Sequence, residues 1–344
     1  MLNRHHGGND LSLDISLDFS ANLNPLGMPE KVREAVIASA AGWEKYPDPL
    51  CGELRGKLSQ KLGVPVSDIV CGNGADDLIY RIVSALRPKR ALICAPAFGE
   101  YRKALSEYGC TVDEHFLRIE NDFALTESIL DSIAGSDMLI LASPNNPTGQ
   151  IIKTELLAAI AEKCSETGAY FLCDESFIGF SPESEKLTAL NLLNGNTIVL
   201  RSFTKLFAMA GLRIGYTVCG SRAIAEKISA SGQYWSVSAP AQAAGIAALD
   251  ENDYIKRTAD LIKSEREHLA AELAGMGVKV FPSDTDFILF RARTDLGELL
   301  LERKILIRSC ADFSGLDGGF FRTAVRTGFE NEQLIAAIRR IMNG

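Results

Sequence analysis

The strongest constraint on the fold is a repeated alternation of short, wholly apolar segments with longer segments of helical period. The segment 75–86, for example, places Leu78, Ile82 and Val83 on one face of a helix. Strands that are covered on both faces have continuous apolar runs. We therefore expect an α/β protein whose mixed, mostly parallel sheet is covered by helices on both faces. The predicted strands are 91–95, 138–142, 169–173, 197–200 and 212–219.

The pattern changes after about residue 230, where long helical segments lead into shorter strand-like pieces and a last helix. This change predicts a large domain over 31–229 and a smaller α+β domain over 230–344. The first thirty residues are too few to form a domain alone. We expect residues 1–30 to pack with the small domain.

Charge and composition exclude several classes of function. The 344 residues include 36 basic and 44 acidic side chains, a net charge of −8, without any Lys/Arg-rich run, so no nucleic-acid partner is expected. No apolar run reaches the length of a membrane span and the first thirty residues lack a secretory signal, which predicts a cytoplasmic protein without a membrane partner. The eight cysteines and four histidines lack zinc-binding spacing, which predicts reduced thiols and no metal.

Polar and aromatic side chains follow four of the predicted strands. Because ligands bind beyond the carboxyl ends of parallel strands, these side chains are candidates for one shared site. Each has a plainer alternative: Asp174 could cap a helix, Lys205 could be a surface lysine, and Asn145 could form a turn. The candidates are Phe98, then Asn145 and Asn146, then Asp174 and Glu175, and finally Ser202, Thr204 and Lys205.

Two segments favour a bound phosphate group. The segment 72–76 places glycines directly before the helix that begins near Ala75, where free backbone N–H groups bind anions. In the segment 201–216, hydroxyls, Lys205 and Arg213 gather around one turn, which suits a phosphate monoester beside a Schiff-base lysine. Pyridoxal 5'-phosphate needs such a cradle and lysine, a carboxylate for its ring nitrogen and an aromatic face. The sequence therefore predicts this cofactor.

The motifs GNGADD, APAFGEY, SPNNPTG, LCDESF and SFTKLFAMAGLRIGY resemble the fold-type-I, aspartate-aminotransferase-like enzymes, in the branch of the histidinol-phosphate aminotransferases. The resemblance covers essentially the whole chain and implies that Lys205 binds the cofactor covalently and that Asp174 pairs with the pyridine nitrogen. It also implies that Phe98 stacks on the ring and that Asn146 contacts the ring hydroxyl. Tyr46, in KYPDP, matches a tyrosine that reaches the phosphate across a homodimer interface, which implies a shared active site. The residues implied for the cofactor phosphate are Gly74, Ala75, Asp76, Ser202, Thr204 and Arg213.

Within this branch, the segments HGGN, DFSANLNPLGMP, EKYPD and ILIRSCADFSGLDGGFFRTAVRT are similar to the L-threonine-O-3-phosphate decarboxylases of cobalamin biosynthesis. Phe177 stands where the aminotransferases carry a tyrosine. The resemblance implies that the substrate is a phosphorylated amino acid, which is decarboxylated; an aminotransferase and a ligand-sensing regulator are the alternatives. A phosphate beside a carboxylate favours more than one cation. The implied substrate residues are His6, Asn24, Arg308 and Arg322; the role of Arg326, and whether Arg322 binds carboxylate or phosphate, are left open.

Overall fold

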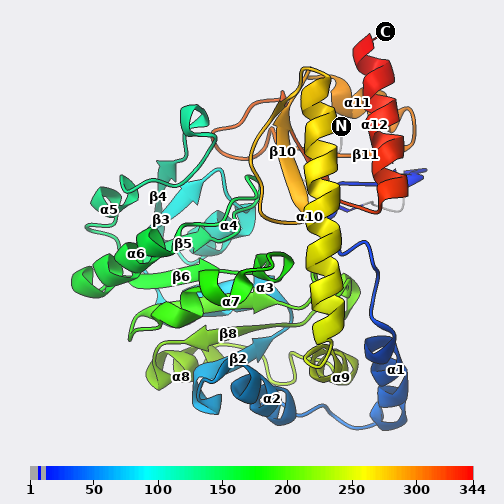
Figure 1. Cartoon of the computed structure of the whole chain (residues 1–344). Coiled ribbons are helices and arrows are strands. Elements are labelled where there is room, and N and C mark those ends of the chain that lie inside the picture. The colour runs from blue at the N-terminus through cyan, green and yellow to red at the C-terminus, as the bar shows by residue number, and fades with distance from the viewer. Residues whose placement is uncertain (1–6, 9–12, 344) are drawn as a thin grey trace.

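A mixed seven-stranded sheet with the order β2-β8-β7-β6-β5-β3-β4 forms the larger part of the molecule (Figure 1). The computed structural model describes residues 7, 8 and 13–343. Strand β8 is antiparallel to both of its neighbours, and the other neighbouring pairs are parallel. This arrangement confirms the predicted α/β class. The strands are β2 (Ile69–Gly72), β3 (Arg90–Ala95), β4 (Thr111–Phe116), β5 (Met138–Ala142), β6 (Tyr170–Asp174), β7 (Thr197–Ser202) and β8 (Gly215–Cys219).

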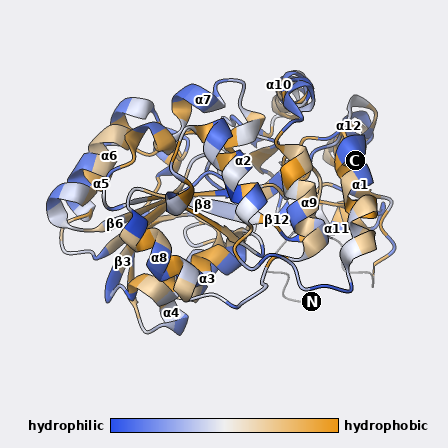
Figure 2. Cartoon of the chain, turned by 90° about the horizontal axis from the view of Figure 1, so that it is seen from below, coloured by the Kyte–Doolittle hydropathy of each residue, from blue (hydrophilic) through white to orange (hydrophobic). Residues whose placement is uncertain are grey.

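Helices cover both faces of this sheet, which is why its strands are apolar throughout. On one face, α3 (Ala75–Leu86), α4 (Gly99–Glu107) and α8 (Arg222–Ala230) pack on a cluster of strand residues that includes Ile140. On the other face, α5 (Ile129–Ser132) and α6 (Thr154–Thr167) pack on a cluster that includes Leu139. Consecutive strand residues therefore enter opposite cores. Figure 2 shows these two helical layers with the strands between them.

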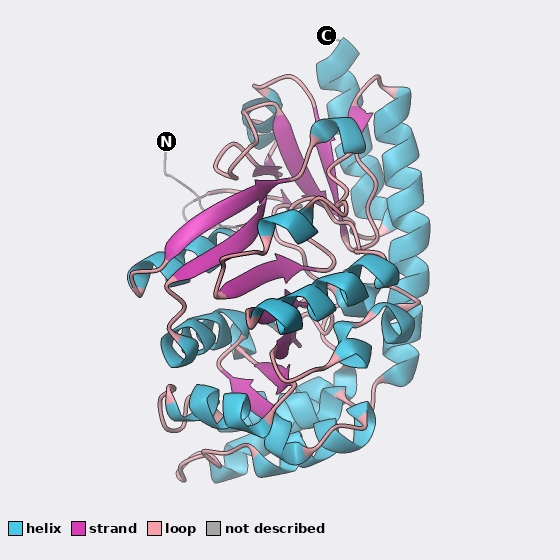
Figure 3. Ribbon diagram, turned by 90° about the vertical axis from the view of Figure 1, so that its left-hand side faces the viewer, coloured by secondary structure: helices cyan, strands magenta, loops and turns pink. Residues whose placement is uncertain are grey.

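A second, antiparallel sheet has the order β12-β13-β10-β9 and forms the smaller part of the molecule. Figure 3 shows both groups of strands with helices packed beside them. No helix among the described residues is both long and apolar enough to cross a membrane. The elements are β9 (Lys279–Val280), β10 (Phe287–Arg291), β12 (Arg308–Ser309), β13 (Phe320–Ala324), α7 (Ser184–Leu187), α10 (Asn252–Gly275), α11 (Leu296–Leu301) and α12 (Gly328–Asn343).

The N-terminal segment joins the smaller part through a short parallel pairing. Strand β1 (Leu17–Asp18) pairs with β11 (Ile305–Leu306), and the fully buried Phe19 enters the apolar cluster between α10, α12 and the second sheet. Residues from both ends of the chain therefore build this part of the molecule.

The segment after residue 230 is divided between the two parts. Helix α9 (Ala239–Ala248) packs with α1 (Glu30–Ala38) and α2 (Gly52–Leu62) in one apolar cluster, which also contains Tyr254 from the first turn of α10. Later residues of α10, such as Ile262 and Leu269, pack in the cluster of the second sheet. In place of the boundary expected at residue 230, we propose that the two parts meet within α10, because α9 shares its core with α1 and α2.

Candidate active site

A cavity of about 220 Å³ lies where the carboxyl ends of β6 and β7 face the second sheet. Residues from both parts of the chain line it, together with Gly7 and the segment 20–22 from the N-terminal region. Among the described residues, no group of His, Cys, Asp and Glu has the arrangement of a metal site. The predicted site residues that line this cavity are Ala75, Asp76, Phe98, Asn146, Asp174, Ser202, Thr204, Lys205, Arg213, Arg308 and Arg322.

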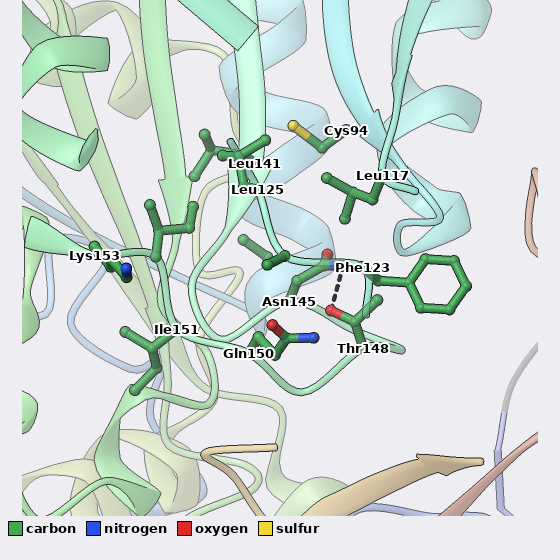
Figure 4. A pocket seen from close by; sticks show the side chains of 13 residues that line it. Cys94, Leu117, Phe123, Leu125, Leu141, Asn145, Thr148, Gln150, Ile151 and Lys153 are labelled. Carbon is green, nitrogen blue, oxygen red and sulfur yellow. Dashed lines mark hydrogen bonds between the residues drawn. The ribbon is translucent and has the colours of Figure 1, made fainter. Parts of the chain in front are cut away.

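Asn145, beside this cavity, faces a different one. Its Nδ2 donates to the backbone oxygen of Pro96 (3.0 Å) and to Oγ1 of Thr148 (3.1 Å), and it lines a cavity of about 120 Å³ on the far side of the 145–150 turn (Figure 4). A third cavity, of about 530 Å³, lies at β4 and is lined by His115, among others. Neither holds the converging set of charges described below, so the 220 Å³ cavity is the candidate active site.

Asp174 presents a buried carboxylate to the cavity. It ends β6, is 5 % exposed, and accepts hydrogen bonds from Oη of Tyr101 (2.7 Å) and from the backbone N–H of Ser176 (2.8 Å). Burial raises the pKa of Asp174, and the hydrogen bonds from Ser176 and Tyr101 oppose that rise. Such a carboxylate can pair with a cationic ring nitrogen in the cavity.

Tyr101 was not anticipated from the sequence. It stands three residues after Phe98, in the first turn of α4, and its ring packs edge-on against Phe98 with 5.6 Å between the centroids. A tyrosine one helical turn from the predicted stacking residue was the available signal. The hydrogen bond from Tyr101 to Asp174 depends on the tertiary fold, because β6 must lie beside β5 to bring Asp174 close to α4.

Lys205 follows β7, and its amine has no recorded hydrogen bond or ion pair among the described residues. Burial is the main cause that lowers the pKa of Lys205, and the charge of Arg322 acts in the same direction. The carboxylates of Asp286 and Asp76 act in the opposite direction. An amine that is desolvated and flanked by cations is more readily deprotonated, which is the condition for Schiff-base chemistry.

The start of α3 and the turn after β7 form a cradle for an anion. Gly74 has a φ of +89°, and a Cβ at this position would lie 2.6 Å from the Arg213 guanidinium, so the close approach requires glycine. Arg213 lies 3.6 Å from the carboxylate of Asp76, at the N-terminal end of α3. Ser202 and Thr204 bring two hydroxyls 2.7 Å apart to the same cavity. Hydroxyls, a guanidinium and a helix N-terminus together suit a phosphate group.

Two buried arginines enter the cavity from the second sheet with different partners. Arg308, on β12, forms an ion pair with Asp312 at 2.7 Å. Arg322, on β13, donates to Oδ1 of Asn146 and to the backbone oxygen of Ser20 (2.8 Å). Its Nε has no hydrogen-bond partner in the described structure, and burial lowers its pKa to about 10. Arg322 therefore offers the cavity a cation that is bound to neutral groups only.

Asn24 does not line the cavity, which differs from the prediction. Its Nδ2 donates to the backbone oxygen of Leu206 and to Oγ1 of Thr258, both at 2.7 Å, so the side chain is used to fix the segment after Lys205. Asn22, two residues earlier, lines the cavity instead. Asn22 is 3 % exposed, and its Oδ1 has no hydrogen-bond partner among the described residues.

Two further residues, Tyr46 and Arg326, also lie away from the cavity lining. Tyr46 is 80 % exposed and stacks on Trp235, with 4.4 Å between the ring centroids. Arg326 forms an ion pair with Glu330 at 2.7 Å, which accounts for its charge. His6 lies outside the described residues.

The residues that are present fit pyridoxal 5'-phosphate. A buried carboxylate, an aromatic ring, an amine without a recorded partner and an anion cradle meet in one cavity, and two buried polar atoms, Oδ1 of Asn22 and Nε of Arg322, have no partner there. Buried polar atoms without partners are rare in folded proteins, and their position here suits a polar ligand.

Comparisons with known proteins identify the family of this chain. Residues 14–341 match the family model described as aminotransferase class I and II. The chain is 37% identical to the threonine-phosphate decarboxylase of Salmonella typhimurium, over 100% of this chain and 98% of that protein, and 30% identical to the histidinol-phosphate aminotransferase of Methanococcus aeolicus, over 97% and 92%. The crystal structure of the histidinol-phosphate aminotransferase from Clostridium acetobutylicum superposes with a TM-score of 0.90 at 29% identity, covering 95% of this chain and 99% of that one.

These likenesses extend over nearly the whole chain, so they confirm the resemblance stated from the motifs and the fold-type-I architecture. The chain belongs to the class I and II aminotransferase family, whose cofactor is pyridoxal 5'-phosphate.

Proposed function

We propose that this protein decarboxylates L-threonine O-3-phosphate to (R)-1-amino-2-propanol O-phosphate and CO₂, in cobalamin biosynthesis. The observation that carries the proposal is the pair of buried arginines, Arg308 and Arg322, at one cavity. The proposed substrate bears a carboxylate and a phosphate, the latter with a charge of roughly −1.5 to −2 at neutral pH. Histidinol phosphate, the substrate of the alternative reaction, has a phosphate but no carboxylate. The 37% identity to a threonine-phosphate decarboxylase supports the same choice.

We propose the cofactor contacts that the family resemblance implies, since most of these residues line the cavity. Asp174 would hold the proton of the pyridine nitrogen, Phe98 would stack on the ring, and Asn146 would contact the ring hydroxyl. Lys205 would bind the cofactor covalently. The cofactor phosphate would bind in the cradle formed by backbone N–H groups, hydroxyls and a guanidinium. The residues of this cradle are Gly74, Ala75, Asp76, Ser202, Thr204 and Arg213.

The proposed reaction needs one bond to break and one proton to move. When bound, pyridoxal 5'-phosphate accepts the electron pair that remains when CO₂ leaves the Cα atom of the substrate. Arg308 and Arg322 would bind the two anionic groups of the substrate and so fix which bond at Cα is oriented for cleavage. The amine of Lys205 then supplies the proton to Cα from Nζ. In this proposal, Arg308 and Arg322 select the bond that breaks at Cα, and Lys205 supplies the proton that replaces CO₂.

We also propose a homodimer with shared active sites. Tyr46 does not line the cavity of its own chain, and it stacks on Trp235, which also contacts Tyr234. These rings belong to a set of exposed large apolar side chains, and exposed apolar side chains that gather in a patch are typical of an interface. The set comprises Ile37, Trp43, Tyr46, Leu50, Tyr234 and Trp235.

A product assay tests the proposed reaction. The purified protein, loaded with the cofactor, is incubated with L-threonine O-3-phosphate alone, and with histidinol phosphate plus 2-oxoglutarate. We expect CO₂ and the phosphorylated amino alcohol in the first reaction, and no glutamate in the second. Glutamate formation without CO₂ would establish an aminotransferase, the alternative that the Methanococcus and Clostridium relatives support.

A further inference from the structure

Asp286 is a buried carboxylate that the proposed reaction has not yet used. It lies directly before β10 and is 0 % exposed. Its Oδ1 accepts a hydrogen bond from Oγ1 of Thr285 (3.2 Å), while its Oδ2 has no hydrogen-bond partner among the described residues. An ionised carboxylate is costly to bury unless opposite charges compensate it. The question is therefore which cations Asp286 faces.

The neighbouring residues place Asp286 directly behind the wall of the active site. The ring of Phe287 lies 5.3 Å from the guanidinium of Arg322 and 5.1 Å from the ring of Phe177, and both of these residues line the cavity. On the other side, the backbone N–H of Asp284 donates to the oxygen of Gly149 (2.8 Å). The segment that carries Asp286 is thus fixed between the second sheet and the 145–150 turn.

Charged groups reach Lys205 from four elements. Arg322 on β13 and Arg213, just before β8, disfavour the ammonium form of Lys205. Asp76 on α3 and Asp286 before β10 favour it. Asp286 in turn faces Lys205 and Arg322, and it also acts on Arg266 of α10. Burial raises the pKa of Asp286 to about 7, and the charges of Lys205 and Arg322 oppose that rise. The carboxylate of Asp286 therefore acts on the amine of Lys205 and on the guanidinium of Arg322.

We propose that Asp286 is the buried counter-charge of Lys205 and Arg322, a positioning residue that keeps a proton on Nζ of Lys205 while this amine is free. The proposal rests on the proposed function, in which Nζ must deliver a proton to Cα. Without Asp286, the charges of Arg322 and Arg213 would favour loss of the proton from Nζ to solvent before it is transferred to Cα. Asp286 retains it without contacting the substrate.

Asp286→Asn tests the proposal, because it removes the charge and keeps the shape. In the protein loaded with pyridoxal 5'-phosphate, the absorbance of the bound cofactor is followed against pH, without substrate. We expect the midpoint of this change to fall by about one unit or more, since an anion that favours the protonated nitrogen at Lys205 is lost. Asp284→Asn, two residues away, removes a carboxylate that is not among the main charges acting on Lys205, and this matched control should leave the midpoint unchanged.

A second readout separates charge from packing. A carboxyl whose pKa is higher in the folded than in the unfolded protein stabilises the fold fully below the unfolded pKa, and this contribution is lost as pH rises through the folded pKa. The wild type should therefore lose stability relative to Asp286→Asn between about pH 4 and 7, as measured by urea unfolding. A residue that only fills space would give the same difference at every pH.

A gentler variant covers the case in which Asp286→Asn does not fold. Thr285→Val removes the recorded hydrogen bond to Asp286, so the carboxylate should be less ionised and the cofactor midpoint should fall by a smaller amount. An unchanged midpoint in the folded variants overturns the proposal. Neither readout uses a substrate, so a failed product assay and a failed counter-charge are distinguishable.

Discussion

Single residues at this site differ in how their charges are satisfied. Asp174 has two hydrogen-bond donors, Tyr101 and the backbone of Ser176, which fix its carboxylate inside the protein. The amine of Lys205 has no such recorded partner and is left to react. Asp174 is therefore a fixed ion whereas Lys205 is a reactive group, because hydrogen bonds stabilise only the first.

Tyr101→Phe should weaken cofactor binding, because it removes one of the two donors to Asp174 while keeping the ring. The pKa of Asp174 should rise, and a less ionised carboxylate holds a cationic ring nitrogen less well. We expect about a tenfold rise in the dissociation constant of pyridoxal 5'-phosphate, corresponding to about 1.4 kcal/mol. Titration of the cofactor-free protein, followed by absorbance, measures it. Tyr80→Phe, which removes a hydroxyl bonded to Glu100, is the control, and an equal effect there would contradict the prediction.

At the scale of elements, a buried ion pair connects the ends of two strands that carry the site. Glu175 follows β6, and Oε2 of this residue accepts a hydrogen bond from Nε of Arg201 on β7 (2.9 Å) and forms an ion pair with Nη2 of the same guanidinium at 2.8 Å. The same carboxylate accepts from Oγ1 of Thr188 (2.8 Å). This pair stands next to Asp174 in sequence and a few residues before Lys205, so it sets the relative position of the two strand ends.

Glu175→Gln should destabilise the fold, because Arg201 would remain buried without its carboxylate. Removal of one partner of a buried ion pair costs about 3–5 kcal/mol. Urea unfolding should show this loss, and Glu175→Gln combined with Arg201→Met should recover part of it. Glu183→Gln removes the partner of an exposed pair with Lys186 and should change stability by less than about 1 kcal/mol. A loss in the Glu175 variant no greater than in this control would show that the buried pair does not hold the strands.

At the scale of the whole molecule, the active site is built by both parts of the chain and, as we propose, by two chains. The large sheet supplies Asp174 and Lys205, and the second sheet supplies Arg308 and Arg322. Tyr46 is exposed and does not line this cavity, which suits a contact with the neighbouring chain.

Mixing two inactive variants tests the shared site. Lys205→Ala lacks the reactive amine, and Tyr46→Ala lacks the proposed contribution to the other chain's site. After random exchange of subunits, half of the dimers are hybrids, and one of the two sites in each hybrid has both residues. We expect activity to return to about a quarter of the wild-type value. Activity no higher than the sum of the separate variants would contradict a shared site.

The sequence by itself determined the layered fold and most of the cofactor site. Apolar runs with a fixed period depend only on local order along the chain, and polar residues that follow parallel strands must meet at one edge, so Asp174 and Lys205 could be placed in advance. The polar and aromatic residues that follow the strands also predicted the cofactor, and the family agrees with that prediction.

Only the tertiary structure decided which neighbouring side chains enter the cavity. Asn22 lines it whereas Asn24 holds the backbone after Lys205, a choice set by the path of the N-terminal segment past the second sheet. Likewise, Tyr101 donates to Asp174 and Asp286 acts on Lys205, and in each pair the two residues are more than seventy positions apart. Sequence periodicity specifies which face of an element is buried, but contacts between distant elements specify what each buried polar group meets there, and that pairing controls its charge and reactivity.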